Sequence, residues 1–290
     1  MKNYFLTGAT GFVGRALVRE LIRRPDTSSI TLLTRQPQLR WPMLSWSPKL
    51  KFYEGDITSV QFPHDSSFTH IIHGANEAND LLQPDAHRYY YTIVEGTERL
   101  LDWADTLPTV EEVLVLSSGA AARDTVYGRA KRQCERITTA HAPCKIARIY
   151  SLIGEETPLN GQYALGQFIA QALYDKEVRL WGGNAQRTYL HVEDAARWLL
   201  TILEHGRTDM PYDVAGDTSV TMEELATKVA KLFGVPLKHI EETAAPRGPD
   251  LYIPHIAPTL ALGCEQTIYL EEALTRLRGH FSQSTREERG

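Results

Sequence analysis

Tyr127 and Lys131 stand four residues apart at the start of a predicted helix over 127–141. This spacing puts both side chains on one helical face. A phenol with a pKa of about 10 is a poor base at neutral pH, and a neighbouring ammonium lowers that pKa by favouring the phenolate. Ser118 ends a predicted strand and can hold a substrate oxygen beside the phenol, with Ser117 as the alternative. These groups suit hydride transfer to or from a carbonyl, which needs a matching proton transfer.

A glycine-rich turn follows the first predicted strand, at residues 2–7. Residues 7–14 read Thr-Gly-Ala-Thr-Gly-Phe-Val-Gly, and a helix with apolar side chains at helical spacing begins at once. Such a turn lets backbone N–H groups approach a pyrophosphate, and the helix dipole favours the negative charge. Because the strand before the turn and the helix after it are both legible, the segment predicts a dinucleotide site.

Short apolar strands alternate with helices through the first half of the chain. The pattern predicts strands at 30–34, 50–53, 70–73, 113–117 and 146–149, with helices at 86–105 and 127–141. Continuous apolar strands separated by helices indicate a parallel sheet covered on both faces, a Rossmann-type doubly wound α/β fold. Ligands of such sheets bind at the carboxyl ends of the strands.

The pattern changes after residue 149. We predict a dinucleotide-binding domain over residues 1–150 and a smaller, mainly substrate-binding lobe over 151–290. A strand and a helix at 188–206 are predicted to return to the first domain, with the strand at 188–192 joining its sheet. Within the lobe, a helix is expected near 163–175 and a strand at 178–181. A capping-box pattern at 221–224 predicts the start of a helix that ends near Gly234.

The end of the second strand separates NAD from NADP. NAD sites commonly place Asp or Glu there for the ribose 2′-hydroxyl. This chain has Thr34-Arg35, which offers no carboxylate to repel a 2′-phosphate and a guanidinium to pair with one. The sequence therefore favours NADP(H) over NAD(H). The alternative is that Arg35 stacks on the adenine, which leaves NAD open.

These motifs resemble those of the extended short-chain dehydrogenase/reductase family, in its branch of nucleotide-sugar epimerases, dehydratases and ketoreductases. Residues 7–14 resemble the family's T-G-x-x-G-x-x-G, residues 73–75 its H-x-A, and residues 187–194 its R-x-[FY]-[IL]-x-V-x-D. Residues 55–57 resemble the segment that contacts adenine, and residues 246–250 look like the late R-P-G-D. In nucleotide-sugar members the arginines of the motifs at 187–194 and 246–250, here Arg187 and Arg247, can bind the diphosphate. Each guanidinium can bond phosphate oxygens bidentately.

The resemblance implies a role for each matching residue. Catalysis falls to Ser118, Tyr127 and Lys131. Substrate binding falls to Asn76, Ser151, Arg187 and Arg247. Cofactor binding falls to Gly8, Thr10, Gly11, Phe12, Val13, Gly14, Arg35, Asp56, Ile57, Gly74, Ala75, Tyr127 and Lys131. Two departures are visible: Thr92 stands where the family has Asn in N-x-x-G-T, and the connection from Ser118 to Tyr127 is short, which predicts a more open substrate pocket.

The residues after Ser118 narrow the reaction. A dehydratase of this family carries an Asp-Glu pair there, and the epimerase-reductases that make GDP-fucose carry a Cys, whereas residues 119–122 read Gly-Ala-Ala-Ala. Because none of these transfers a proton, we expect simple hydride transfer by a ketoreductase acting on a 4-keto-6-deoxy nucleotide-diphosphate sugar. A 4-epimerase with retained NAD and a reductase of flavonoid-like or other small carbonyl compounds stay open. A non-catalytic NADP-binding sensor is the remaining alternative, and the intact Tyr127 and Lys131 argue against it.

Bulk properties exclude other classes. The 290 residues carry a net charge of −5, which argues against a nucleic-acid surface. No apolar run approaches the ~20 residues of a membrane span, so no membrane partner is expected. The three cysteines lack metal-type or redox-type spacing, which predicts no metal site and reduced thiols in the cytoplasm.

A homodimer is also expected from the resemblance. The helices at 86–105 and 127–141 resemble those that form a four-helix dimer interface in the family. Leu100, Leu101 and Trp103 on the first helix either face a partner or only cover the sheet.

Overall fold

The computed structural model describes residues 1–35, 47–64, 67–76, 86–141, 143–159, 163–240 and 250–287. The chain divides into two compact units. The first unit comprises Met1–Ile149, Ala196–Val214 and Ile256–Cys264. The second comprises Tyr150–Ala195, Ala215–His255 and Glu265–Gly290.

The first unit is built on a parallel sheet, and within the described residues the sheet has seven strands in the order β11-β6-β5-β4-β1-β2-β3. Its strands are β1 (Lys2–Thr7), β2 (Thr27–Thr34), β3 (Leu50–Glu54), β4 (His70–His73), β5 (Glu112–Ser118), β6 (Cys144–Ile149) and β11 (Pro211–Val214). The order reverses between β1 and β4, so ligands are expected at the carboxyl ends of these two strands. The predicted Rossmann-type fold is confirmed.

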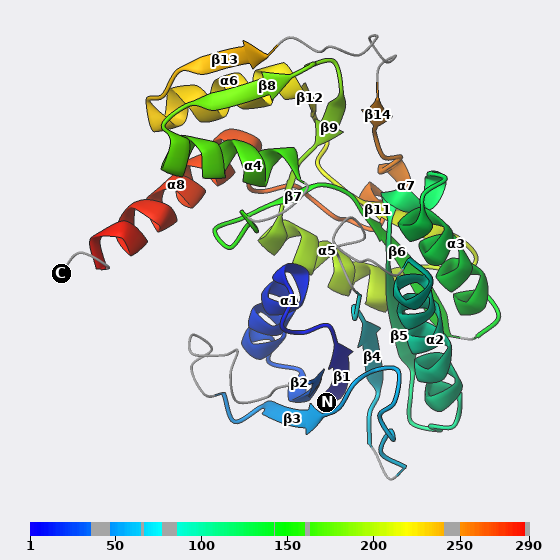
Figure 1. Cartoon of the computed structure of the whole chain (residues 1–290). Helices are drawn as coiled ribbons and strands as arrows, with labels where there is room; N and C mark the ends of the chain where they lie inside the picture. The colour runs from blue at the N-terminus through cyan, green and yellow to red at the C-terminus, as the bar shows by residue number, and fades with distance from the viewer. Residues whose placement is uncertain are drawn as a thin grey trace. The chain divides into compact units, whose positions relative to one another are not determined.

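Helices cover both faces of this sheet, with α1 and α5 on one face and α2 and α3 on the other (Figure 1). Their bounds, together with two short helical elements of the unit, are α1 (Phe12–Arg23), α2 (Ala86–Asp105), η1 (Gly119–Ala122), α3 (Val126–Thr138), α5 (Val192–His205) and α7 (Ala257–Leu260). Each long helix presents an apolar stripe to the strands, which explains why the strands are apolar on both faces.

An aromatic cluster closes the α2 face of the sheet. Trp103 stacks on Phe62 with ring centroids 4.7 Å apart and meets Phe5 of β1 edge-on at 4.7 Å. Leu100, Leu101 and Trp103 are buried in this cluster. They therefore cover the sheet, and the suggestion that they form exposed apolar surface for a partner is wrong.

The last strand of the sheet lies elsewhere than predicted. The sequence predicts that residues 188–192 return to the sheet, but Thr188 ends β9 (Gln186–Thr188), Leu190 and His191 form β10 (Leu190–His191), and Val192 begins α5; both strands belong to small sheets of the second unit. The outer neighbour of β6 is β11, with β5 on the other side of β6. The predicted helix after the returning strand is α5, and it does belong largely to the first unit. Tyr189 is buried, as an apolar strand predicts, but it packs in the apolar core of the second unit and not against the seven-stranded sheet.

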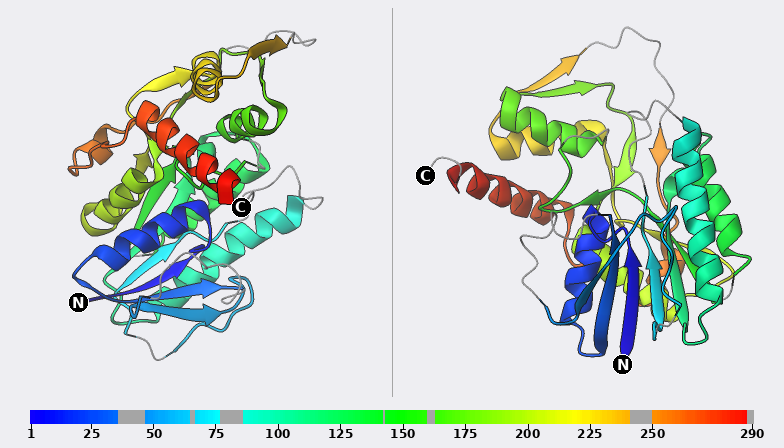
Figure 2. Two further views of the ribbon diagram at one scale, coloured as in Figure 1. Left: turned by 90° about the vertical axis from the view of Figure 1, so that its left-hand side faces the viewer. Right: turned by 60° about the horizontal axis from the view of Figure 1, so that its bottom comes forward.

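The second unit contains three small sheets. β7 (Leu152–Ile153) pairs with β10, β9 pairs with β12 (Ser219–Thr221) and β14 (Leu251–Tyr252), and β8 (Val178–Trp181) pairs with β13 (Leu237–Ile240). Its helices are α4 (Ala164–Ala170), η2 (Gln171–Asp175), α6 (Met222–Phe233) and α8 (Leu270–Glu287). Both views of Figure 2 show α4 and α6 beside the β8–β13 pair. The predicted capping box is present, since Thr221 accepts from the N–H of Glu224 and the Glu224 carboxylate accepts in return.

The three cysteines are free thiols, and all are buried. Burial raises the pKa of the Cys144 thiol to about 12 and that of Cys264 to about 11. At neutral pH these two thiols are therefore protonated and poorly reactive. The cytoplasmic location stays a prediction.

In the part of the chain that the structure describes, no helix has both the length and the apolar composition needed to cross a membrane.

Candidate functional site

A hollow of about 590 Å³ opens at the carboxyl ends of β1, β2 and β4, and we call it the glycine-turn hollow. Asn76, Thr92 and Ile93 form part of its wall. The predicted cofactor residues that line it are Gly8, Thr10, Gly11, Arg35, Asp56, Ile57, Gly74 and Ala75. Three others, Phe12, Val13 and Gly14, form the first turn of α1. The structure therefore brings the predicted cofactor segments together at the point where the strand order reverses.

Two glycines make this turn possible. Gly8 has a φ of +72°, and a Cβ there would lie 2.2 Å from the carbonyl oxygen of Gly74. At Gly14 a Cβ would lie 2.2 Å from the carbonyl oxygen of Gly8. α1 begins at once, and no side chain caps it at Gly11. Its first N–H groups can therefore bind an anion, so the residues present fit the pyrophosphate of a dinucleotide.

A buried hydrogen-bond chain ties the turn to β4 and α2. The hydroxyl of Thr7 lies 2.8 Å from Nδ1 of His73 and accepts from the N–H groups of Gly74 and Ala75 at 3.2 and 3.1 Å. Nε2 of His73 lies 3.1 Å from the hydroxyl of Thr97. Burial and the charge of Lys131 lower the pKa of His73 to about 3, so the imidazole is neutral. This chain fixes the floor of the hollow and carries no charge.

Arg35 follows the carboxyl end of β2 at the edge of the hollow. Its side chain is 64% exposed, and Nη1 lies 3.8 Å from the Asp56 carboxylate. Asp56 is held in turn by the N–H and the hydroxyl of Thr58, at 2.9 and 2.7 Å. The guanidinium is therefore placed beside a lining carboxylate, in reach of an anion bound in the hollow.

The start of α3 presents Tyr127. Thr125 caps the helix by accepting from the N–H of Gly128 at 2.9 Å. A Cβ on Gly128 would lie 2.4 Å from the carbonyl oxygen of Ala120 and 2.3 Å from that of Arg123. The short connection after Ser118 thus runs directly against the first turn of α3, and only glycine fits between them.

Lys131 lies one turn after Tyr127. Its side chain is buried, with Nζ donating to the carbonyl oxygen of Leu116 at 3.0 Å and lying 5.8 Å from the centre of the Tyr127 ring. Burial lowers the pKa of Lys131, while Cys134 and Glu135 nearby oppose that shift. The predicted tyrosine and lysine therefore do lie side by side on the first turns of α3.

The two serines at the end of β5 have different partners. Ser117 donates to Oε1 of Glu135 at 2.6 Å, whereas the hydroxyl of Ser118 accepts from the N–H of Ala120 at 3.2 Å. Glu135 also receives both arms of Arg148, at 2.8 and 2.7 Å. Ser117 is thereby bound to a partly buried ion pair, so Ser118 is the better candidate for the substrate oxygen. Sequence reasoning missed this pair, although Glu135 follows Lys131 by the same four-residue spacing.

Asn76 connects the hollow to the predicted catalytic residues. It lines the hollow, and its Nδ2 donates to the phenol oxygen of Tyr127 at 3.3 Å. Asn76 therefore bridges the glycine-turn hollow and the Tyr127 oxygen within the first unit. The resemblance had assigned Asn76 to the substrate.

In the second unit, Arg187 is already engaged. Its guanidinium donates to the Asp250 carboxylate at 2.5 Å and to the Asp250 carbonyl oxygen at 2.8 Å, and it lies 5.5 Å from the centre of the Tyr252 ring. Arg247, the other predicted diphosphate ligand, lies outside the described residues. Ser151 is half-buried just before β7, and its carbonyl oxygen accepts from the N–H of Leu190 at 3.2 Å.

A profile of the NAD dependent epimerase/dehydratase family matches residues 4–215, which hold the glycine turn, Tyr127 and Lys131. The chain belongs to this family.

Relatives of this epimerase/dehydratase family member are named for several activities on nucleotide sugars. The chain is 24% identical over 272 residues to a trifunctional UDP-glucose 4,6-dehydratase/UDP-4-keto-6-deoxy-D-glucose 3,5-epimerase/UDP-4-keto-L-rhamnose-reductase of Arabidopsis thaliana. That match spans 81% of this chain but only 40% of the plant protein. It is also 24% identical over 281 residues to a dTDP-glucose 4,6-dehydratase of Streptomyces griseus, covering 86% and 84% of the two chains.

A solved structure agrees with the fold of this family member. The dTDP-glucose 4,6-dehydratase of Bacillus anthracis in complex with NAD has a TM-score of 0.82 at 17% identity, and the match covers 99% of this chain and 98% of that one. At this identity the likeness establishes the shared fold and leaves the reaction to the residues of the site.

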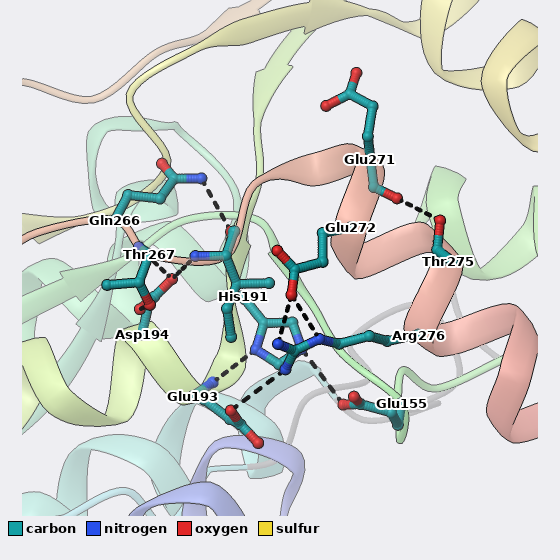
Figure 3. A network of polar contacts seen from close by, with 11 residues as sticks. Glu155, His191, Glu193, Asp194, Gln266, Thr267, Glu271, Glu272, Thr275 and Arg276 are labelled. Carbon is teal, nitrogen blue, oxygen red and sulfur yellow. Dashed lines mark hydrogen bonds and ion pairs between the residues drawn. The ribbon is translucent and has the colours of Figure 1, made fainter.

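The family motif at 187–194 ends in a network that supports the second unit (Figure 3). Asp194 is fully buried and accepts from the N–H and hydroxyl of Thr267, at 3.0 and 2.7 Å, and from the N–H of Ile268 at 2.8 Å. His191 is fully buried beside Glu155, with Nε2 3.3 Å from Oε2. In this family member the Asp of the motif therefore anchors the segment before α8, while His191 lies against Glu155 near β7, and the sequence suggested neither role.

Proposed function

We propose that this protein is an NADP-dependent oxidoreductase that reduces a 4-keto-6-deoxy nucleotide-diphosphate sugar. One observation carries the proposal: the Tyr127–Lys131 pair is intact, while the 3₁₀ turn after Ser118 consists of glycine and alanines. The pair can transfer the proton that accompanies a hydride. The turn offers no second acid or base for the elimination of water, although relatives of this chain are dehydratases.

The chain's own residues have distinct tasks in this reaction. A nicotinamide bound in the glycine-turn hollow would supply the hydride. Tyr127 would give its proton to the substrate oxygen as the carbonyl carbon is reduced. The ammonium of Lys131 would stabilise the phenolate that remains, and the Ser118 hydroxyl would hold the substrate oxygen in place.

The preference for NADP is proposed from Arg35. A 2′-phosphate would compete with Asp56 for the exposed guanidinium and form a charge-assisted pair with it. NAD is the alternative cofactor, since the dehydratase structure of Bacillus anthracis is a complex with NAD. Titration of the protein with NADPH and NADH would distinguish the two.

A nucleotide-diphosphate substrate is proposed from Arg187 and Arg247. Asp250 holds Arg187 in the structure, so the diphosphate would have to replace a carboxylate that already forms a hydrogen-bonded ion pair. The proposal is supported by the named substrates of relatives, which are nucleotide sugars. Ser151 is proposed to contact the sugar.

The test is a panel of 4-keto-6-deoxy sugars linked to UDP, dTDP, CDP or GDP, with NADPH oxidation followed by absorbance. Oxidation that depends on one of these substrates supports the reductase. If a nucleotide sugar is instead interconverted with its 4-epimer and the protein keeps NAD through purification, the epimerase replaces it. If only small carbonyl compounds without a nucleotide are reduced, the nucleotide-sugar assignment is wrong.

A homodimer is proposed on the family resemblance of α2 and α3. With Leu100, Leu101 and Trp103 buried, the contact would have to use other α2 residues, such as Tyr91, which is 55% exposed. A monomeric mass by light scattering at micromolar concentration would reject the dimer.

A further inference from the structure

The hydrogen bond between Asn76 and Tyr127 has a direction. Nδ2 of Asn76 is the donor and the phenol oxygen is the acceptor, 3.3 Å apart. Asn76 directly follows the segment 73–75 that forms the floor of the hollow, and the N–H groups of Gly74 and Ala75 are held by Thr7. The amide therefore extends from a fixed stretch of backbone toward the oxygen that would exchange the proton.

A donor at this oxygen discriminates between the two states of the phenol. A hydrogen bond to an ionised acceptor is stronger than one to a neutral acceptor, so an amide N–H stabilises the phenolate more than the phenol. The amide does this without adding a charge. An amide that donates to the phenol oxygen also does not compete for the phenol proton.

The charged groups described around Tyr127 do not by themselves account for stabilising its phenolate, so a hydrogen bond from Asn76 can add to their effect. Lys131 places a cation near the ring, but its side chain is buried and its Nζ already donates to the carbonyl oxygen of Leu116. On α2, Tyr90 packs with Tyr127 against a small apolar cluster formed by Ile93, Ala130 and Cys134. Behind Lys131 lie groups that are neutral or paired: His73, Cys134 and Glu135, the last bound to Arg148.

We propose that Asn76 is a catalytic residue, whose side-chain amide stabilises the Tyr127 phenolate by a hydrogen bond to its oxygen and shares this task with Lys131. The inference rests on the proposed function, because it assigns Asn76 to the reacting oxygen of that site. In the reducing direction the phenol proton goes to the substrate oxygen, and the negative charge left on Tyr127 is met by the Asn76 N–H and the Lys131 ammonium.

The test measures the ionisation of Tyr127 itself, in the full chain without substrate. The protein is labelled with ¹³Cζ-tyrosine, and the Tyr127 signal is identified by its loss in Tyr127→Phe. Its titration is then followed by NMR in the wild type, Asn76→Ala and Asn76→Asp. Thr10→Ala, a polar-to-alanine change in the same hollow, is the matched control.

We expect the midpoint of the Tyr127 titration to rise by about one pH unit in Asn76→Ala, because a hydrogen bond to the ionised form is lost. In Asn76→Asp it should rise further, because a carboxylate repels the phenolate. Thr10→Ala should leave it unchanged. Equal midpoints in the wild type, Asn76→Ala and Asn76→Asp would overturn the proposal.

This readout separates the two proposals. A protein that reduces no 4-keto sugar but shows the expected shifts fails as a reductase while Asn76 still acts on Tyr127. Once a substrate is found, the pH profile of kcat should move by the same amount in Asn76→Ala as the NMR midpoint, and KM should change less than kcat. A change confined to KM would return Asn76 to the substrate-binding role and contradict the proposal.

Discussion

The two units differ in how ready their candidate residues are to bind a ligand. In the first unit, the predicted cofactor residues line one hollow, and Asn76 connects that hollow to Tyr127. In the second unit, Arg187 is bound by Asp250 and stacked near Tyr252. The first unit therefore leaves its candidate anion-binding groups available, whereas Arg187 in the second would have to exchange a partner before it could bind an anion.

The difference follows from how each site is built. The glycine-turn hollow is made from segments that leave the ends of parallel strands, where backbone N–H groups are available without any rearrangement. The Arg187 site is made from side chains that are 63 residues apart in the chain and satisfy one another. Backbone sites of this kind stay open in the absence of ligand, while a cluster of opposite charges closes on itself.

Tyr127→Phe tests the prepared half most strongly. Loss of the general acid should lower turnover by about 10²-fold or more, while NADPH binding, measured by fluorescence titration, stays close to that of the wild type. Tyr174→Phe, at an exposed tyrosine of the second unit, is the control. Near wild-type turnover in Tyr127→Phe would remove the proposed chemistry from the first unit.

Arg187→Ala tests the self-paired half. Loss of a charge-assisted bond costs about 1.5–3 kcal/mol, or roughly ten- to hundredfold in kcat/KM. The effect should fall on KM, because the diphosphate lies away from the reacting carbon and is bound equally in the ground and transition states. The same is expected of Arg247→Ala. Arg179→Ala, at another paired arginine of the second unit, is the control.

Asp250→Asn sharpens the same test in the opposite direction. If the ion pair restrains Arg187, removing the carboxylate should lower KM. If Arg187→Ala and Arg247→Ala both keep the wild-type KM, no diphosphate binds at these arginines. The small-carbonyl reductase would then replace the nucleotide-sugar reductase as the proposed function.

Arg35→Asp probes the cofactor end of the first unit. The carboxylate should repel a 2′-phosphate and accept from a 2′-hydroxyl, so NADPH should bind about tenfold more weakly and preference should move toward NADH. Arg23→Asp makes the same charge change at the exposed end of α1 and serves as the control. Tighter binding of NADH than of NADPH by the wild type would contradict the assignment of Arg35.

Glu155→Gln tests whether the charge pairing of the second unit also stabilises it. The pKa of Glu155 is lowered from 4.5 to about 2, first by its contact with His191. The contact should therefore stabilise the fold fully above pH 4.5 and lose that effect as the pH falls toward 2.

Because the carboxylate is one-third exposed and Nε2 of His191 falls short of regular hydrogen-bond geometry, we expect a loss of about 1 kcal/mol at pH 7. Urea unfolding at pH 7 and pH 4 should show a smaller difference from the wild type at the lower pH. Glu98→Gln, on the exposed side of α2, should change neither value. A difference that grows on acidification would refute the linkage.

The sequence predicted correctly those elements of the fold whose conformation depends on residues close by in the chain. The turn at 7–14, the helix α2 and the helix α3 follow from local apolar spacing and glycines, and the structure confirms them. It misplaced the seventh strand, since β11 has only four residues and includes Asp213. The apolar residues at 188–192 indicated burial correctly, but periodicity does not tell which sheet buries a strand.

The candidate site divides in the same way. Tyr127, Lys131 and the glycine turn are spaced closely enough in sequence to be read together. The pairing of Arg187 with Asp250, of Ser117 with Glu135 and of Asn76 with Tyr127 depends on how distant segments pack. The motifs had already singled out the residues of the Arg187–Asp250 and Asn76–Tyr127 pairs, but not that they contact each other. That contact is what the structure adds.

Gly128 ties the length of a loop to the position of a reactive atom. With its hydrogen facing two backbone carbonyls, the first turn of α3 cannot slide or rotate without the connection from Ser118 moving with it. An insertion in that connection would displace the Tyr127 phenol, and a side chain at position 128 would push the first turn of α3 away from the connection. A longer connection would therefore need a second change that returns the tyrosine to its place, so the length of this loop and the position of the phenol cannot be redesigned separately.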